Sequence, residues 1–182
     1  MSRERILEGA GTILDSGKYG HLTVDALARS LHMSKSTLYK YFASKEDVVV
    51  AIVEESCLAA EVEVDKALAK GSAADQLAEL AAIIGRHGKR LPRAVLVEPE
   101  RLPPICSERL AVTRTHFAEA THRVVRRGVD DGSFRHPSPE VVAGAFVAAA
   151  LAVLVQAAQS EEPDYATSLG YLPGLFLPAL VP

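Results

Sequence analysis

Apolar residues recur along this chain at intervals of three and four, which is the period of one face of an α-helix. In the first such stretch, residues 3–16, Ile6, Ala10, Ile13 and Leu14 fall on one face. No stretch of useful length alternates apolar and polar residues as a half-buried β-strand does. The pattern therefore predicts an all-α fold of about nine helices.

Capping and turn residues set the expected boundaries of these helices. Thr23, Ser34, Ser44 and Ser72 are predicted N-caps, because their side-chain oxygens can accept hydrogen bonds from the free N–H groups of a first turn. Gly88 is expected to close the fifth helix. The predicted ranges are 3–16, 24–31, 35–42, 45–69, 74–87, 93–97, 105–130, 139–160 and a last segment from about 164 that glycines and prolines interrupt.

The second and third helices are short and joined by a tight turn. The turn places His32 where a left-handed backbone is expected, a conformation that histidine tolerates better than most residues. A small core for this pair is predicted from Leu27, Leu31, Met33, Leu38 and Phe42. Two short helices joined in this way form a helix-turn-helix, which places its second helix in the major groove of DNA. We predict a DNA-binding domain over residues 1–47 and a second helical domain over 48–182.

Donor groups dominate the face of the third helix that points away from this core. Hydroxyls, phenols and amines can donate to phosphates or to base edges. The expected DNA-contacting residues on this helix are Lys35, Ser36, Thr37, Tyr39, Lys40 and Tyr41. Ser36 and Thr37 are the candidates for base edges. The alternatives are a half-buried Tyr39 and lysines that are plain solvated charges.

Two further phosphate contacts are expected outside the third helix. Thr23 caps the second helix in any case, and a phosphate contact would be additional. Lys45 begins the fourth helix, where a cation opposes the helix dipole, so a functional reason for it is expected.

The charge distribution supports a nucleic-acid partner for the N-terminal segment alone. The formal net charge is −3. Between Lys18 and Lys45, however, five basic residues face a single acid, Asp25. A basic N-terminal segment followed by an acidic remainder indicates that only the N-terminal segment contacts phosphates.

At these residues the sequence closely resembles the TetR family of bacterial repressors. The resemblance rests on Thr23, on the run Thr37-Leu38-Tyr39-Lys40-Tyr41-Phe42 and on Lys45, and it is specific over residues 3–55. Downstream, residues 127–135 resemble the family's turn before the dimerising helices. His32 departs from the family pattern, in which glycine is commoner, and so does the proline-broken last helix.

The resemblance implies a homodimer, a double-stranded DNA operator and a small-molecule effector. The dimer would form through the helices near 139–160 and 164–180, and the effector would bind among the middle helices. Ligand binding would then shift the fourth helix and change the spacing of the two recognition helices.

Possible effector contacts lie at Thr113, Phe117 and Thr121, which are spaced four apart on one predicted helix face. Core packing with satisfied hydroxyls is the alternative for all three. The many alanines and valines suggest that any pocket is apolar.

The block of residues 141–160 is twenty residues long and carries no charge. This length can span a bilayer. The block contains many alanines and lacks flanking Lys, Arg or Trp residues, which is poor membrane anchoring. We therefore expect a buried helix, most simply one shared between two subunits, and no membrane partner.

No other chemistry is expected from the sequence. The two cysteines, Cys57 and Cys106, show no metal spacing and are expected to be buried small residues, with a redox-sensing role as the alternative. His116 and His122 do not share a helix face, so no metal site is predicted. No catalytic signature frames the Ser, His and Asp residues, so we expect neither an enzyme nor a cofactor. The absence of a secretion-signal pattern at the N-terminus predicts a cytoplasmic location.

The leading hypothesis is a DNA-binding transcriptional repressor that binds a palindromic operator as a dimer and is released by a small apolar effector. A second hypothesis keeps the fold but makes the chain a ligand-binding or interaction protein with a vestigial DNA-binding head. A third is constitutive DNA binding without an effector.

Overall fold

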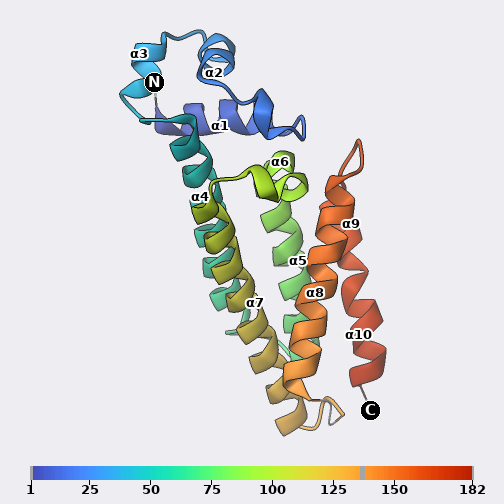
Figure 1. Cartoon of the computed structure of the whole chain (residues 1–182). Coiled ribbons are helices and arrows are strands. Elements are labelled where there is room, and N and C mark those ends of the chain that lie inside the picture. Colours follow the sequence, from blue (N-terminus) through green and yellow to red (C-terminus); the bar gives the residue numbers. More distant parts are fainter. Residues whose placement is uncertain (1, 136–137, 182) are drawn as a thin grey trace. The chain divides into compact units, whose positions relative to one another are not determined.

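The computed structural model describes residues 2–135 and 138–181, and every regular element in these ranges is helical (Figure 1). The helices are α1 (Arg3–Leu14), η1 (Tyr19–His21), α2 (Val24–Ser30), α3 (Lys35–Tyr39), α4 (Lys45–Ala67), α5 (Ala73–Arg90), α6 (Arg93–Val97), η2 (Pro99–Arg101), α7 (Pro104–Asp130), α8 (Pro139–Ala158), α9 (Tyr165–Gly170) and α10 (Leu172–Leu180), where η denotes a 3-10 helix. The predicted all-α fold class is confirmed.

The chain packs into two compact units. The first unit comprises Met1–Cys57 and Arg90–Leu110, and the second comprises Leu58–Lys89 and Ala111–Pro182. The first unit therefore contains the three N-terminal helices, the start of α4 and the segment around α6. The domain boundary predicted between residues 47 and 48 falls inside α4 and stays a prediction.

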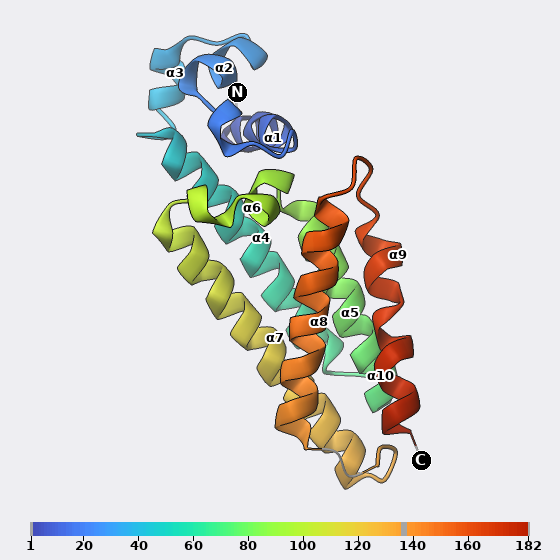
Figure 2. The same ribbon diagram turned by 45° about the vertical axis from the view of Figure 1, so that its right-hand side comes forward.

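The first unit contains the helix-turn-helix. Leu27, Leu31 and Leu38 are buried, and Met33 and Phe42 are half-buried, so the small core predicted for the α2–α3 pair is present. Leu31 also packs on α1, where a Cβ at Gly9 would lie 2.7 Å from its Cδ2 atom. The end of α2 is thus held against α1, and α1 to α3 can be followed as one group of helices in Figure 2.

The turn between α2 and α3 has the conformation that the sequence predicts. The φ angle of His32 is 54°, which lies in the left-handed region that favours glycine. The Met33 N–H donates to the carbonyl of Ala28 over 2.9 Å and closes the turn. This one backbone reversal sets the direction in which α3 leaves α2.

The second unit is built around α5 and α8. Leu77, Leu80 and Ile83 of α5 and Phe146 of α8 are fully buried. In both views α8, α9 and α10 lie side by side (Figures 1 and 2). The rings of Phe146 and Phe176 meet edge to face with centroids 5.3 Å apart, which ties α8 to α10.

Glycine allows two close approaches in the second unit. The predicted end of the fifth helix at Gly88 is wrong, because α5 continues to Arg90. The Leu154 side chain of α8 fills the place that a Cβ at Gly88 would take, so this glycine allows a helix contact and does not end the helix. Phe134 packs in the same way on Gly128, and its N–H donates to the Gly128 carbonyl over 2.7 Å to close the turn after α7.

The other predicted helices differ by at most two residues at their ends, except the third helix and the last segment, which differ more. The third helix ends at Tyr39, because the N–H groups of Lys40 and Tyr41 donate to the carbonyls three residues earlier, as in a tighter turn. The last predicted segment is two helices, α9 and α10. Pro173 stands in the first turn of α10, where its missing N–H costs no helical hydrogen bond.

The left-handed turn leads to a stability prediction. A side chain in this conformation costs roughly 1–2 kcal/mol, and glycine avoids this cost but loses about 0.5–1 kcal/mol more backbone entropy on folding. We expect His32→Gly to raise the free energy of unfolding by up to about 1 kcal/mol and the β-branched His32→Val to lower it. Urea unfolding followed by circular dichroism checks this. Equal midpoints for the three proteins would contradict a strained turn.

Candidate nucleic-acid interface

The two helices of the helix-turn-helix begin at the side-chain caps that the sequence predicts. The Oγ1 atom of Thr23 accepts a hydrogen bond from the Ala26 N–H over 3.0 Å. The Oγ atom of Ser34 accepts one from the Thr37 N–H over 3.2 Å. Each cap satisfies an N–H group that the first turn leaves free, so both helix starts are fixed locally.

Ser34 also organises the hydroxyls at the start of α3. Its Oγ lies 2.8 Å from the Oγ of Ser36 and 2.9 Å from the Oγ1 of Thr37. The two candidates for base-edge contacts therefore share one hydroxyl partner. Sequence reasoning placed Ser34 as a cap only, and nothing in a linear pattern indicates the shared contacts.

Most of the side chains predicted to contact DNA on and after α3 are exposed. Tyr39 is 53% exposed and Tyr41 is 40% exposed, and Lys35, Ser36 and Lys40 are also exposed. Thr37 is half-buried, whereas Leu38 points into the core. Neither phenol packs in the interior. The alternative interpretation of Tyr39 as a half-buried core residue is therefore wrong. The DNA contacts themselves stay a prediction.

Lys45 occupies a more enclosed position than the other lysines. Its Nζ lies 4.7 Å from the centroid of the Tyr19 ring and 4.0 Å from the Oε1 of Glu46. Cation–π contact and a nearby carboxylate both favour the ammonium at the start of α4. Burial, followed by the charge of Glu46, raises the pKa of Tyr19, so this phenol stays neutral near pH 7.

An acidic residue that the sequence analysis noted only as a charge lies beside the start of α3. The Oδ1 of Asp25 in α2 is 2.5 Å from the Nζ of Lys35. The hydrogen bond and charge of this carboxylate raise the pKa of Lys35. One of the predicted phosphate contacts is therefore already paired with an anion.

Two carboxylates join α6 to the N-terminal helices within the first unit. Asp15 accepts a hydrogen bond from the Arg93 N–H at the start of α6 over 3.1 Å. Glu98, at the end of α6, accepts one from the Tyr19 N–H over 2.8 Å. These contacts are reciprocal, and they attach both ends of α6 to the segment between α1 and α2.

The three predicted effector contacts, Thr113, Phe117 and Thr121, are buried in the second unit. The Thr113 hydroxyl donates to the Oε1 of Glu61 over 2.7 Å, and the Thr121 hydroxyl donates to the Phe117 carbonyl over 2.8 Å. These are the satisfied hydroxyls that the packing alternative describes. Contact with an effector stays a prediction.

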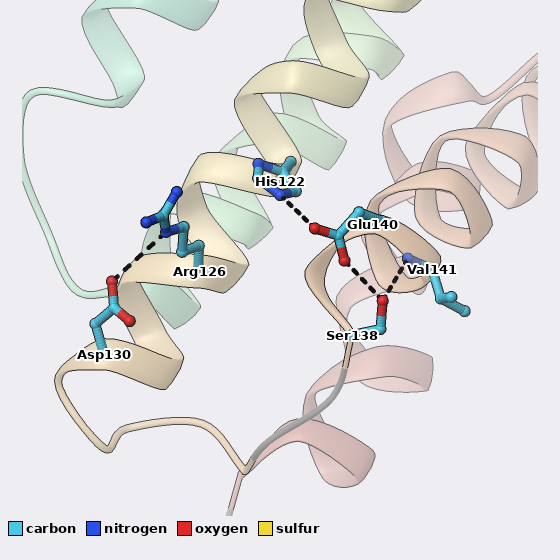
Figure 3. Close-up of polar contacts among 6 residues, drawn as sticks. All are labelled: His122, Arg126, Asp130, Ser138, Glu140 and Val141. Atoms are coloured by element: carbon cyan, nitrogen blue, oxygen red, sulfur yellow. Dashed lines mark hydrogen bonds and ion pairs between the residues drawn. The ribbon is translucent and has the colours of Figure 1, made fainter.

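A groove lies between α7 and α8, and its lining includes His122, Glu140, Ala143 and Gly144. At its edge the Nε2 of His122 lies 3.2 Å from the Oε1 of Glu140, and the Ser138 hydroxyl donates to the other oxygen of Glu140 over 2.8 Å (Figure 3). Backbone hydrogen bonding, the Ser138 hydroxyl and His122 lower the pKa of Glu140 to about 2. Across the described parts of the chain, no three His, Cys, Asp or Glu side chains are grouped to hold a metal ion.

The two cysteines are buried free thiols, as the sequence predicts. Burial, with a smaller contribution from Cys57, raises the pKa of Cys106 to about 11. Cys106 is therefore a neutral thiol at neutral pH, and a neutral thiol reacts slowly.

Helix α8 is long and apolar enough to span a membrane by length and composition, but it is one such helix among the described residues, and a third of its most apolar stretch is buried. We expected α8 to be buried on every side, but in a single chain only one of its faces is buried. The opposite face is an exposed stripe, which we call the α8 face. It consists of Val141, Gly144, Ala145, Ala148, Leu151, Ala152 and Gln156.

Comparison with known proteins identifies the N-terminal segment. Residues 6–52 match the family model described as bacterial regulatory proteins, tetR family. The N-terminal segment of this chain is therefore similar to the tetR family of regulators. Among its relatives are uncharacterized HTH-type transcriptional regulators of Mycobacterium bovis and Mycobacterium tuberculosis, 35% identical over 97 residues. The match covers 51% of this chain and 46% of each relative, so it spans about half the length of these relatives.

Several solved structures of regulators share the fold of nearly the whole chain. The regulator PfmR from Thermus thermophilus is 24% identical, with a TM-score of 0.79 and 97% of this chain and 96% of that chain covered. A putative regulator from Saccharomonospora viridis in complex with choline is 18% identical, with a TM-score of 0.81 and coverages of 99% and 97%. AibR in complex with isovaleryl coenzyme A and operator DNA is 16% identical, with a TM-score of 0.73 and coverages of 97% and 98%. At these identities the likeness establishes the fold.

The position of Ser34 leads to a second stability prediction. Removing an N-cap hydroxyl costs about 1 kcal/mol with alanine but only a few tenths with glycine. We expect Ser34→Ala to lower the free energy of unfolding by about 1 kcal/mol and Ser34→Gly to lower it less. Urea unfolding of both variants checks the order. An unchanged midpoint for Ser34→Ala would show that the cap contributes nothing to stability.

Proposed function

We propose that this chain is a DNA-binding transcriptional regulator that represses genes by binding a palindromic operator as a dimer. The observation that carries the proposal is the set of exposed hydroxyls, phenols and amines on α3 and on the two residues after it, within the segment that matches the tetR family. We further propose that residues 1–47 form the DNA-binding domain, that residues 48–182 bind the effector and the second subunit, and that the protein acts in the cytoplasm without catalysing a reaction.

The proposed contacts divide by chemistry. Ser36 and Thr37 stand at the start of α3, and we assign them to base edges because small hydroxyls can donate or accept there. Phosphates are assigned to the groups that present a phenol, an amine or a capping hydroxyl. These are Thr23, Lys35, Tyr39, Lys40, Tyr41 and Lys45. Phosphate contacts fix the position of a protein on the duplex, and base contacts select the sequence.

The α8 face supports the proposed dimer. It is an apolar stripe that lies exposed in a single chain, and exposed apolar stripes of this kind are typical of protein interfaces. Its small residues let a second helix approach closely. Leu175 of α10 is 72% exposed and would extend this surface, in agreement with the interface predicted near 139–160 and 164–180. Such a dimer would present two α3 helices to half-sites about one helical turn apart.

We propose that a small apolar effector releases the operator. Proteins of the same fold are known with choline and with isovaleryl coenzyme A, the latter together with operator DNA, which supports the binding of an effector but not its apolar character. The apolar character is proposed from the many alanines and valines of the chain. The route we favour from effector to DNA is α6, because Asp15 and Glu98 attach both ends of this helix to the segment before α2. A shift of α6 would then move the helix-turn-helix.

Selection from a random double-stranded DNA pool tests the proposed regulator. We expect an enriched palindrome, whose affinity falls about 10³–10⁵-fold between 50 and 200 mM salt if the dimer contacts about 6–10 phosphates. A folded, dimeric protein that enriches no sequence at low salt would favour the ligand-binding alternative with a vestigial head. Binding that no panel of small apolar molecules releases would favour constitutive binding.

Point variants test the assigned contacts on the enriched duplex. Tyr39→Phe and Lys45→Ala should each weaken binding about tenfold or more, equally for related and unrelated sequences, because each removes a bond to a charged phosphate. Thr37→Val should instead change the preferred sequence. Fluorescence anisotropy with two duplexes measures both effects, and unchanged binding in all three variants would remove these assignments.

A matched pair of variants tests the proposed dimer. Leu151 on the α8 face is 40% exposed, and Leu58 on α4 is 49% exposed. We expect Leu151→Glu to yield monomers, since it places two symmetry-related charges in an apolar interface, and Leu58→Glu to leave the dimer intact. Sedimentation velocity checks both. Dissociation by both variants, or by neither, would argue against the α8 face as the interface.

A further inference from the structure

One acidic residue stands among the bases of the N-terminal segment and contacts the start of α3. Asp25 is the single acidic residue between Lys18 and Lys45 in the sequence. It stands in the first turn of α2, and Lys35 stands in the first turn of α3. The left-handed turn at His32 folds the chain back between them, so that residues ten positions apart come into contact.

The contact between these two side chains is short and solvent-exposed. The Nζ of Lys35 lies 2.5 Å from the Oδ1 of Asp25, and the side chains are 54% and 63% exposed. Exposed ion pairs contribute little to stability, because water already solvates both charges well. The pair is therefore poorly explained as a device that holds the two helices together. Its position beside the proposed phosphate contacts suggests another role.

We propose that Asp25 restrains DNA binding by competing with the phosphate backbone for the ammonium of Lys35. The inference rests on the proposed DNA-binding function and goes beyond it, because it assigns a role to a residue that opposes the contact. The carboxylate and a phosphate oxygen offer the lysine the same kind of charged acceptor. Lys35 gives up one anion when it takes the other.

The physical basis is counterion release. A lysine that neutralises a phosphate releases a condensed cation from duplex DNA, which makes the slope of log K against log salt more negative by about 0.9 per contact. When the lysine leaves a carboxylate to do so, the freed negative charge stays beside the same phosphates and offsets the positive charge of the lysine. The two charges nearly cancel in their effect on the duplex. In the wild-type protein the Asp25–Lys35 pair therefore adds little to the salt-dependent part of the affinity.

The restraint acts on the part of binding that does not depend on sequence. Phosphate contacts supply nearly all of the non-specific affinity, whereas base edges select the sequence. Asp25 thus lowers the affinity for any duplex by a similar factor, and it leaves the preference set by Ser36 and Thr37 unchanged. A regulator with such a restraint spends less time on the many unrelated sites of a genome.

The inference is tested by measuring DNA affinity against salt concentration for a double-mutant cycle in which the charges of Asp25 and Lys35 are removed singly and together. Four full-length proteins are compared by fluorescence anisotropy from 50 to 400 mM salt on two short duplexes of unrelated sequence. They are the wild type, Asp25→Asn, Lys35→Gln and the double variant. Asparagine keeps the shape of aspartate, and thermal unfolding checks that each protein is folded.

We expect Asp25→Asn to make the salt slope more negative by about 0.9 per protomer, or about 1.8 per dimer, on both duplexes. Its affinity at 0.1 M salt should rise on the order of tenfold per protomer. Lys35→Gln should bind more weakly, with a less negative slope, because it leaves the charge of Asp25 uncompensated beside the phosphates, and the double variant should return close to the wild type. Glu161→Gln is the control. It also removes one negative charge at an exposed position, but in the second unit, and it should leave the slope unchanged.

Several outcomes would overturn the inference. An unchanged or weaker slope in folded Asp25→Asn would show that the carboxylate does not compete with phosphate. A steeper slope that persists in the double variant would assign the effect to the charge of Asp25 alone, without Lys35. An effect confined to one duplex would indicate base contact by Lys35. If neither the wild type nor Asp25→Asn binds either duplex at 50 mM salt, the proposed DNA-binding function itself fails.

Discussion

The left-handed turn at His32 determines where every exposed group of α3 stands. It reverses the chain in three residues, and Leu31 beside it is held between the small core of the α2–α3 pair and Gly9 of α1. Because the turn is short, α3 has little freedom relative to α2. The hydroxyls of Ser36 and Thr37 then take their positions from Ser34, and the ammonium of Lys35 takes its position from Asp25. A change in the turn would move all of these groups together.

This dependence also explains how a signal could reach the surface of α3 from a distance. The segment before α2 is attached to α6 by Asp15 and Glu98 through hydrogen bonds to backbone N–H groups. Backbone N–H groups have fixed positions, so these bonds constrain the main chain itself. A displacement of α6 would therefore pull on the chain just before Thr23, and the rigid turn would carry the displacement to α3.

The parts of the fold that sequence reasoning predicts correctly are those that local chemistry determines. The caps at Thr23 and Ser34 and the conformation of His32 involve contacts within a few residues, so the sequence around each position contains the necessary information. Gly88 was misread as a helix end because the atom that requires it, Cδ1 of Leu154, lies sixty-six positions later in the chain. The pairing of Asp25 with Lys35 was missed for a related reason. The charges were visible, but their contact depends on the angle between two helices.

The net charge of the whole chain predicts repulsion from DNA, whereas the charge of its N-terminal segment predicts attraction. The two effects act at different distances. A net charge of −3 repels DNA at long range, and salt screens that repulsion over about a Debye length. At contact distance only the groups around α3 matter, and there one of the lysines is already paired. Attraction by charge therefore acts at contact distance, through the other bases of the N-terminal segment, and salt weakens it there. Because it acts only at that range, its strength depends on the turn and the caps, which set the positions of these groups.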